Sequence, residues 1–166
     1  GGILYFRADD GTNGLELWRS DATEGGTFPV IDLAAGSASG APGELAVLNG
    51  LLFFAAEEST AGRELWVSDG TAAGTERVLD INPGPESSNP DELTVAGKQI
   101  LFEADDGTNG PELWTTNGKS NGTKLVLDVR AGGMVASVIV GFICLLLAGQ
   151  LARGKRSAWW IAVILL

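Results

Sequence analysis

A recurrence with a fixed period is the feature that most constrains the fold of this chain. The string ELWRSDATEGGT begins at Glu16, ELWVSDGTAAGT begins at Glu64 and ELWTTNGKSNGT begins at Glu112, so both intervals span 48 positions. The second and third repeats align without gaps from Leu45 and Leu93 onward. Periods of about 20–50 residues are typical of solenoids and propellers, in which each repeat is one supersecondary unit.

Each repeat contains short β-prone runs separated by Gly, Asp, Asn or Pro, and the runs are too short for helices. In the second repeat we expect strands at 44–48, 51–56, 63–68 and 75–81. The first repeat aligns with the others only after the position of their first strand, so it has room for three strands. The sequence therefore predicts eleven strands in all. Four strands in roughly 40–50 residues is the size of one propeller blade. The sequence therefore predicts an all-β array of β-propeller-like blades in residues 1–130.

The blades are placed at about 1–36, 37–84 and 85–132. Because a closed propeller needs at least about four blades, we expect missing blades or another chain to be needed to close a ring. Within the blades, Asp69-Gly70 and Asn117-Gly118 tolerate positive φ and favour tight hairpins. Ala22 stands at the equivalent position of the first repeat, so a looser turn is expected there.

The recurring residues of the motif are interpreted as structural. A Trp at one blade position is more typical of packing between blades than of a sugar-stacking platform, which is the alternative. A Glu in every blade indicates a structural interaction that is repeated in each blade rather than a catalytic carboxylate, because an active site needs only one set of catalytic residues. The same argument applies to Asp32, Asp80 and Asp128. The structural motif comprises Glu16, Trp18, Asp21, Glu64, Trp66, Asp69, Gly70, Thr75, Glu112, Trp114, Asn117 and Gly118.

The string ADDGTNG occurs twice and offers the oxygen ligands that Ca²⁺ prefers. The candidate calcium ligands are Asp9, Asp10, Asn13, Asp105, Asp106 and Asn109. No EF-hand register is present, and the alternative is that these acidic, Gly-rich loops are solvated turns. No other cofactor is expected.

Charge and composition exclude several classes of function. The net charge is −10, and all 21 acidic residues lie at or before Asp128, which argues against nucleic-acid binding by the repeats. The chain has no His, which excludes catalytic triads that use imidazole. Its one Cys, Cys144, excludes intrachain disulfides and a CxxC zinc site.

The C-terminal tail differs from the repeats. Residues 131–152 carry no charge and predict a transmembrane helix of about 33 Å, enough for a hydrocarbon core of roughly 30 Å. The basic loop at 153–156 is expected to be cytoplasmic, and 157–166, with Trp159 and Trp160 near its start, to begin a second, truncated transmembrane helix. The repeats would then be extracellular or periplasmic. The alternative for the first apolar segment is a buried core helix.

The recurring ELWxSDGTxxGT, followed by VLDINPG and by a strand pair of the LTVAG…LF type, resembles the bacterial ELWxxDGT repeat family over residues 1–133. That resemblance implies an exported, surface-associated repeat protein, thought to be propeller-like, with no assigned catalytic residues. The stretch LLLAGQLARGKRSAWWIAVILL is similar to transmembrane segments of lysylphosphatidylglycerol synthetase/flippase-type proteins. None of the soluble aminoacyl-transfer domain of that family is present in the sequence.

These observations favour a membrane-anchored, surface-exposed repeat protein that acts as a binding or scaffolding module for glycan or protein ligands. We expect it not to be an enzyme. The alternative is a fragment of a membrane enzyme of the lipid aminoacyl-transferase/flippase type, or of a propeller hydrolase whose catalytic part is absent. A purely mechanical spacer is a third hypothesis, which a glycan or protein binding screen would separate from the first. The chain opens on GGILYF and stops within an apolar run, so we expect a fragment of a larger protein.

Overall fold

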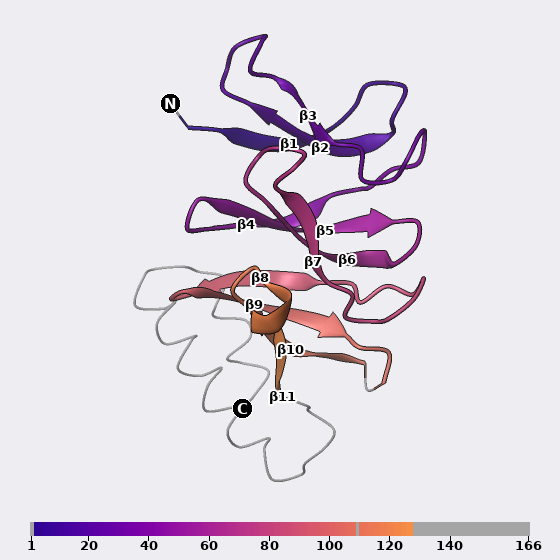
Figure 1. The fold of residues 1–166 in the computed structure, drawn as a ribbon, viewed down its shortest axis with the longest axis vertical. Coiled ribbons are helices and arrows are strands. Elements are labelled where there is room, and N and C mark those ends of the chain that lie inside the picture. Colours follow the sequence, from indigo (N-terminus) through magenta and orange to yellow (C-terminus); the bar gives the residue numbers. More distant parts are fainter. Residues whose placement is uncertain (1, 109, 128–166) are drawn as a thin grey trace, which may run out of the picture. The chain divides into compact units, whose positions relative to one another are not determined.

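The computed structural model describes residues 2–108 and 110–127, which form eleven strands in three antiparallel sheets (Figure 1). Sheet A contains β1 (Leu4–Asp9), β2 (Leu15–Ser20) and β3 (Phe28–Ile31). Sheet B contains β4 (Gly43–Leu48), β5 (Leu51–Glu58), β6 (Gly62–Ser68) and β7 (Thr75–Leu79). Sheet C contains β8 (Asp91–Ala96), β9 (Gln99–Asp105), β10 (Pro111–Thr116) and β11 (Lys124–Leu127), with the short 3-10 helix η1 (Ser120–Gly122) before β11.

The predicted all-β class and the distribution of three, four and four strands are confirmed. In each sheet the strands follow one another in chain order, because every connection within a repeat joins neighbouring antiparallel strands. The described part of the chain does not close into a ring. Within it, no helix is long and apolar enough to cross a membrane. The transmembrane segments expected at 131–152 and 157–166 and the loop between them lie outside the described residues.

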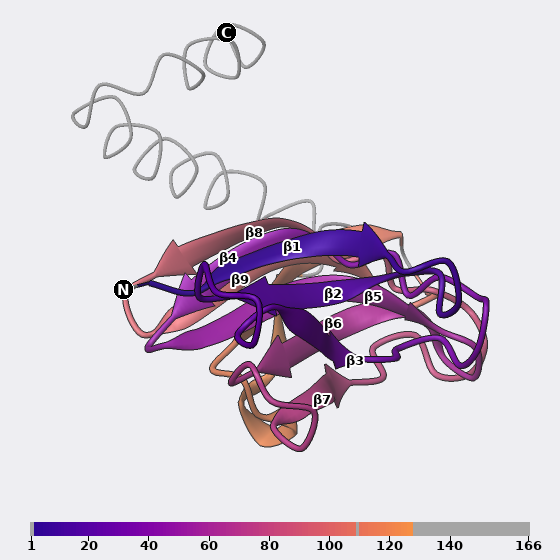
Figure 2. The ribbon, with the colours of Figure 1, turned by 90° about the horizontal axis from the view of Figure 1, so that it is seen from above.

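The three sheets pack face to face and enclose two apolar clusters. Between sheets A and B lie Leu17, Val30, Leu33, Leu52, Phe54, Ala56 and Trp66. Between sheets B and C lie Leu48, Phe53, Leu65, Val67, Val78, Ile81, Ile100, Phe102, Ala104 and Trp114. In the view along the stack, the outer strands β3 and β7 lie on the same side of their sheets, as a structural repeat requires (Figure 2). Burial of these apolar faces supplies the main stabilisation of the array.

The register of the strands explains why neighbouring residues of the motif enter different clusters. In every sheet a Phe lies opposite the motif Trp on the adjacent strand, as in the pair Phe54 and Trp66. Because side chains alternate across a strand, Trp66 faces sheet A while Leu65 faces sheet C. A register shift between the motif Leu and Trp recurs in all three sheets, so the irregularity belongs to the repeat.

The observed strands differ slightly from those expected in the second repeat. β5 extends to Glu58 rather than ending at residue 56, and β7 ends at Leu79 rather than at residue 81. The expected tight hairpin is wrong: residues 69–74 form a longer loop between β6 and β7. Side-chain hydrogen bonds stabilise this loop and replace the backbone geometry of a two-residue turn.

Candidate functional site

The loop that follows each motif Trp is built around one acidic or amide side chain. Asp69 Oδ1 accepts hydrogen bonds from the backbone N–H of Thr71 at 2.9 Å and from its hydroxyl at 2.7 Å. The Thr71 hydroxyl in turn accepts from the N–H of Gly74 at 3.0 Å. Ser68 and Thr75 close the base of the loop with a hydroxyl–hydroxyl bond of 2.7 Å. The loop carboxylate therefore serves the backbone, and the hydrogen bonds from Thr71 lower the pKa of Asp69.

Equivalent hydrogen bonds recur in the first and third repeats. Asp21 accepts from the N–H and hydroxyl of Thr23, and Asn117 accepts from the N–H of Lys119. The expectation of a looser first turn is wrong, because Ala22 adopts φ 72° and preserves the geometry that Gly70 adopts at φ 89°. Ala22 carries the backbone strain of this left-handed conformation, which the surrounding hydrogen bonds hold in place.

The motif Glu holds the segment that connects one sheet to the next. Glu64 on β6 accepts hydrogen bonds from the N–H of Ile81 at 3.1 Å, from the N–H of Ser88 at 3.0 Å and from the Ser88 hydroxyl at 2.6 Å. Glu16 makes the equivalent bonds to the N–H groups of Leu33 at 3.0 Å and Gly40 at 2.8 Å. Both carboxylates thus bind the backbone 17 and 24 residues farther along the chain.

Burial dominates the electrostatics of this Glu. The side chain of Glu64 is fully buried, and desolvation raises the pKa of its carboxyl, an effect that the hydrogen bonds from Ser88 and Ile81 partly oppose. Glu112 is also buried, and the backbone positions equivalent to the partners of Glu64 lie outside the described residues. Of the Asp series, Asp32 accepts from the N–H of Gly36 at 3.2 Å, Asp80 lies 3.9 Å from Arg77, and Asp128 lies outside the described residues.

The motif tryptophans have two environments. Trp66 lies between sheets A and B, and Trp114 lies between sheets B and C, where both are buried. Trp18 occupies the same position on sheet A, but it faces away from sheet B and is only half-buried. It packs against Phe6 with the ring centroids 6.3 Å apart.

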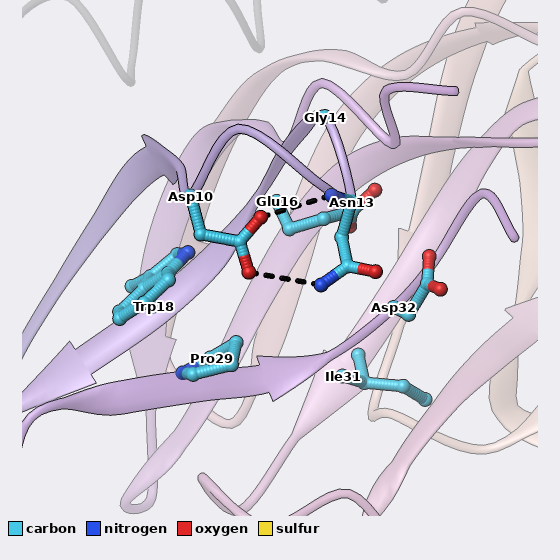
Figure 3. Close-up of a pocket in the computed structure, with 8 residues that line it drawn as sticks. All are labelled: Asp10, Asn13, Gly14, Glu16, Trp18, Pro29, Ile31 and Asp32. Atoms are coloured by element: carbon cyan, nitrogen blue, oxygen red, sulfur yellow. Dashed lines mark hydrogen bonds between the residues drawn. The ribbon is translucent and has the colours of Figure 1, made fainter. Parts of the chain in front are cut away.

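A pocket of about 190 Å³ lies beside Trp18 on the outer side of sheet A (Figure 3). The loop after β1 supplies its upper rim, β2 and β3 supply its floor, and the residue after β3 completes the wall. The lining residues are Asp10, Asn13, Gly14, Glu16, Trp18, Pro29, Ile31 and Asp32. The carboxylate of Asp10 accepts hydrogen bonds from the backbone and the side chain of Asn13, both at 2.9 Å, which fixes the rim. The pocket combines an aromatic wall with two exposed carboxylates.

The equivalent place on sheet B is filled. Arg77 is the periodic counterpart of Pro29, and its guanidinium lies 3.1 Å from Glu58 and 3.9 Å from Asp80. Glu58 and Asp80 are the periodic counterparts of Asp10 and Asp32. On sheet A, Pro29 stands at the position of this arginine and the acidic pair is retained, so no basic side chain of the repeat lies between the two carboxylates.

The candidate calcium residues hold their own loops. Asp9 accepts from the N–H of Gly11 at 2.7 Å, Asp105 from that of Gly107 at 2.8 Å, and Asp106 from that of Thr108 at 2.9 Å. Asp10 binds Asn13 as described above, and Asn109 lies outside the described residues. No group of three or more carboxylate, thiol or imidazole side chains that could hold a metal ion occurs among the residues that the structure describes.

Comparisons with protein-family models, with curated proteins and with solved structures each gave no match for this chain. They therefore support neither of the two resemblances described above.

Sequence reasoning missed the pocket and the partners of the motif Glu. The residues that line the pocket are spread along the chain from Asp10 to Asp32, and only the pairing of β2 with β3 brings them together. One signal was available in the aligned repeats, where Pro29, Arg77 and Leu125 occupy the same position.

Proposed function

We propose that residues 1–127 form consecutive blades of a propeller-like array and that the chain is a non-catalytic binding or scaffolding module, displayed outside a membrane by its apolar tail. The pocket on sheet A is proposed as its ligand site. The observation that carries this proposal is a cavity on sheet A in which Pro29 stands at the position of Arg77 while the acidic residues Asp10 and Asp32 are kept.

The chemistry of the pocket favours a protein ligand that presents a basic side chain. On sheet B an arginine occupies the equivalent position between two carboxylates. On sheet A the carboxylates of Asp10 and Asp32 remain, and the indole of Trp18 adds a surface for a cation–π contact. A glycan stacked on Trp18 is the second candidate ligand.

The structural use of the recurring carboxylates supports the non-catalytic part of the proposal. Glu16 and Glu64 accept hydrogen bonds from backbone N–H groups, and Asp21 and Asp69 do the same within their loops. A carboxylate engaged in this way is an unfavourable general base, because the proton that it takes up must displace existing donors.

The test uses the full chain in detergent micelles and a Pro29→Arg variant. The new arginine would lie between Asp10 and Asp32, as Arg77 lies between Glu58 and Asp80, and so fill the pocket without disturbing the fold. Binding of arginine-containing peptides, measured against matched citrulline peptides and a glycan array, should be lost in Pro29→Arg. Pro85→Arg adds the same charge at an exposed position outside the pocket and should bind as the unmodified chain does.

Equal binding by Pro29→Arg and the unmodified chain would exclude the pocket as the ligand site. Binding of glycans without binding of arginine-containing peptides would indicate that the ligand of the pocket is a sugar and not a basic side chain. Display outside the membrane is tested separately by protease treatment of sealed right-side-out vesicles, in which the repeats should be cleaved. Protection of the repeats would contradict the proposed orientation.

A further inference from the structure

The outer face of sheet A exposes apolar side chains at positions that are buried in the other sheets. Leu4, Leu52 and Ile100 occupy one position of the repeat, and their exposed fractions are 63%, 2% and 0%. Phe54 and Phe102 are likewise fully buried, whereas Phe6 at the same position is half-buried. Sheets B and C bury these positions because a preceding sheet covers them. Sheet A has no such cover within the described part of the chain.

At the other end of the array, the face of sheet C that points away from sheet B also exposes an apolar side chain that is buried at the same position of the other sheets. Val30, Val78 and Val126 occupy one position of the repeat, with exposed fractions of 3%, 5% and 48%. Val30 packs in the cluster between sheets A and B, and Val78 packs in the cluster between sheets B and C. Val126 occupies the position that would face a following sheet. Apart from the strand equivalent to β4 and β8, which sheet A lacks, the two ends of the array therefore present the two halves of the interface that the chain forms internally twice.

The side chains at the two ends are also matched in size. In the internal interfaces, a glycine of the loop after the motif Trp packs against an aromatic residue of the preceding sheet. A Cβ added at Gly70 would touch the hydroxyl of Tyr5, and a Cβ added at Gly118 would lie 3.0 Å from the ring of Phe53. At the free end of sheet A this loop position is Ala22, which carries the additional methyl group.

At the free end of sheet C, the position of Tyr5 and Phe53 is taken by Leu101, which is smaller. The position of Arg19 and Val67, which also lies against these loop glycines, is taken by Thr115. The larger loop residue at one end thus corresponds to the smaller facing residue Leu101 at the other, while Thr115 matches Val67 in size. This compensation is expected where the two ends of the same sequence meet.

We propose that a second copy of this chain docks head to tail, with sheet C of one copy covering the outer face of sheet A of the other in the geometry of the internal interfaces. The inference rests on the proposed blade array and identifies the partner that completes it. The described part of each copy, residues 2–108 and 110–127, contributes three sheets, so two copies contribute six, within the range of about four to eight blades found in closed propellers. Two equivalent contacts would then close the assembly, which prevents growth into fibres.

This arrangement covers Trp18, as the preceding sheets cover Trp66 and Trp114, and it leaves the carboxylates of the pocket at the rim. Its counterpart on sheet B lies at the rim of the internal interface, where the side chains of Arg77 and Glu58 keep exposed fractions of 29% and 30%. A second copy that covers sheet A in the same geometry would therefore leave the side of the pocket formed by Asp10 and Asp32 accessible to a basic side chain.

The experiment measures the protein mass of the full chain in density-matched detergent by sedimentation equilibrium. The unmodified chain should sediment as two copies of the 17.2 kDa protein. Leu4→Glu and Val126→Glu each place a charge on one end face, and each should sediment as a single copy. Both side chains are exposed in a single copy, so neither change should reduce the β signal in circular dichroism.

Val95→Glu is the matched control. Val95 is exposed to 47%, nearly the same as Val126, but it lies on β8 opposite Ile100 and faces away from the end of the array. This variant should remain a pair of copies. Because detergent, tail and substitution type are shared, a difference between Val95→Glu and Val126→Glu isolates the end face from association through the tail.

A mixture of the two disrupted variants identifies the head-to-tail arrangement. When the Leu4→Glu protein is mixed with the Val126→Glu protein, sheet C of the first and sheet A of the second are both unmodified. One intact contact can then form, so mixed pairs should reappear. If the unmodified chain is a single copy, or if Val126→Glu stays paired, the proposal is wrong. Pairing lost in Leu4→Glu alone would instead indicate that two A sheets meet. A β spectrum with a single-copy mass would refute the pairing while leaving the proposed blade array intact.

A crosslink gives an independent check. In a Cys144→Ser background, Ala22→Cys in one copy and Leu101→Cys in another should join through a short bismaleimide, since both positions have exposed surface in a single copy. Their internal counterparts lie close together, because a Cβ at Gly118 would lie 3.0 Å from the ring of Phe53. Absence of a crosslinked pair at concentrations where the unmodified chain sediments as two copies would contradict the proposed geometry.

Discussion

Replacing Glu64 with Ala tests the role of the motif carboxylate most sharply. The substitution removes the acceptor of the backbone N–H groups of Ile81 and Ser88, both of which lie in buried residues outside the strands. The Ser88 hydroxyl keeps an alternative acceptor in the carbonyl of Arg63, at 3.4 Å. Two N–H groups are therefore left without their acceptor.

The magnitude follows from those two donors. An unsatisfied buried polar group costs about 1–3 kcal/mol, so two cost roughly 2–6 kcal/mol. Removal of a desolvated charge offsets part of this loss. The free energy of unfolding is therefore expected to decrease by about 2–3 kcal/mol. We expect the connection between sheets B and C to loosen first, because Ile81 and Ser88 lie within it.

The assay is denaturant unfolding of the full chain, followed by tryptophan fluorescence. Glu76→Ala provides the control, since Glu76 is an exposed residue of β7 and its loss should change the stability by less than about 0.5 kcal/mol. If Glu64→Ala and Glu76→Ala unfold at the same denaturant concentration, the hydrogen bonds to Ile81 and Ser88 do not hold the connection, and the reasoning fails.

The same carboxyl predicts a pH dependence. Burial raises the pKa of Glu64 in the folded chain above its ordinary value of 4.5. A raised folded-state pKa means that the stabilisation due to this proton is fully present below about pH 4.5 and is lost as the pH rises through the folded-state value. Glu64→Gln should remove this component from the profile of unfolding free energy against pH. An unchanged profile would contradict the assignment.

Three further predictions concern the repeat framework. Trp66→Ala should cost about 3–5 kcal/mol in an unfolding titration, because Trp66 fills the interface between sheets A and B. Gly70→Val should cost about 1–3 kcal/mol, because its φ of 89° disfavours a β-branched residue and the new Cβ would meet Tyr5, whereas Ala73→Val in the same loop should be nearly neutral. Millimolar Ca²⁺ should leave the melting temperature unchanged; a rise that Asp9→Asn with Asp105→Asn abolishes would establish the calcium site instead.

The strands could be predicted because local signals agree with the fold. The apolar runs of β5 and β6 are bounded by Asn49-Gly50, by the turn at residues 59–61 and by Asp69-Gly70, so the sequence indicates where each strand begins and ends. The packing of Trp66 and Leu65 on opposite faces follows from the alternation of side chains along a strand. Both features depend only on residues that are close together in the chain.

The site was harder to predict because its contacts are non-local. The partners of Glu64 are backbone groups 17 and 24 residues away, and a backbone N–H group leaves no signature in the sequence. The pocket depends on Pro29 lying between Asp10 and Asp32, which only the β2–β3 register establishes. The longer loop after β6 was missed because the side chains of Asp69 and Thr71 form the turn, whereas the Asp-Gly dipeptide alone indicates a backbone turn.

Amide-resolved hydrogen exchange of the full chain tests the central claim, that the recurring carboxylates act as framework residues of the stacked sheets. The N–H groups of Leu33, Gly40, Ile81 and Ser88 all lie outside the strands, so without the motif Glu they would exchange like other loop amides. The account predicts that they are protected to the degree seen in β5 and β6, and that Glu64→Ala selectively exposes Ile81 and Ser88. Exchange of these four amides as fast as that of the exposed residue Ala73 would contradict it.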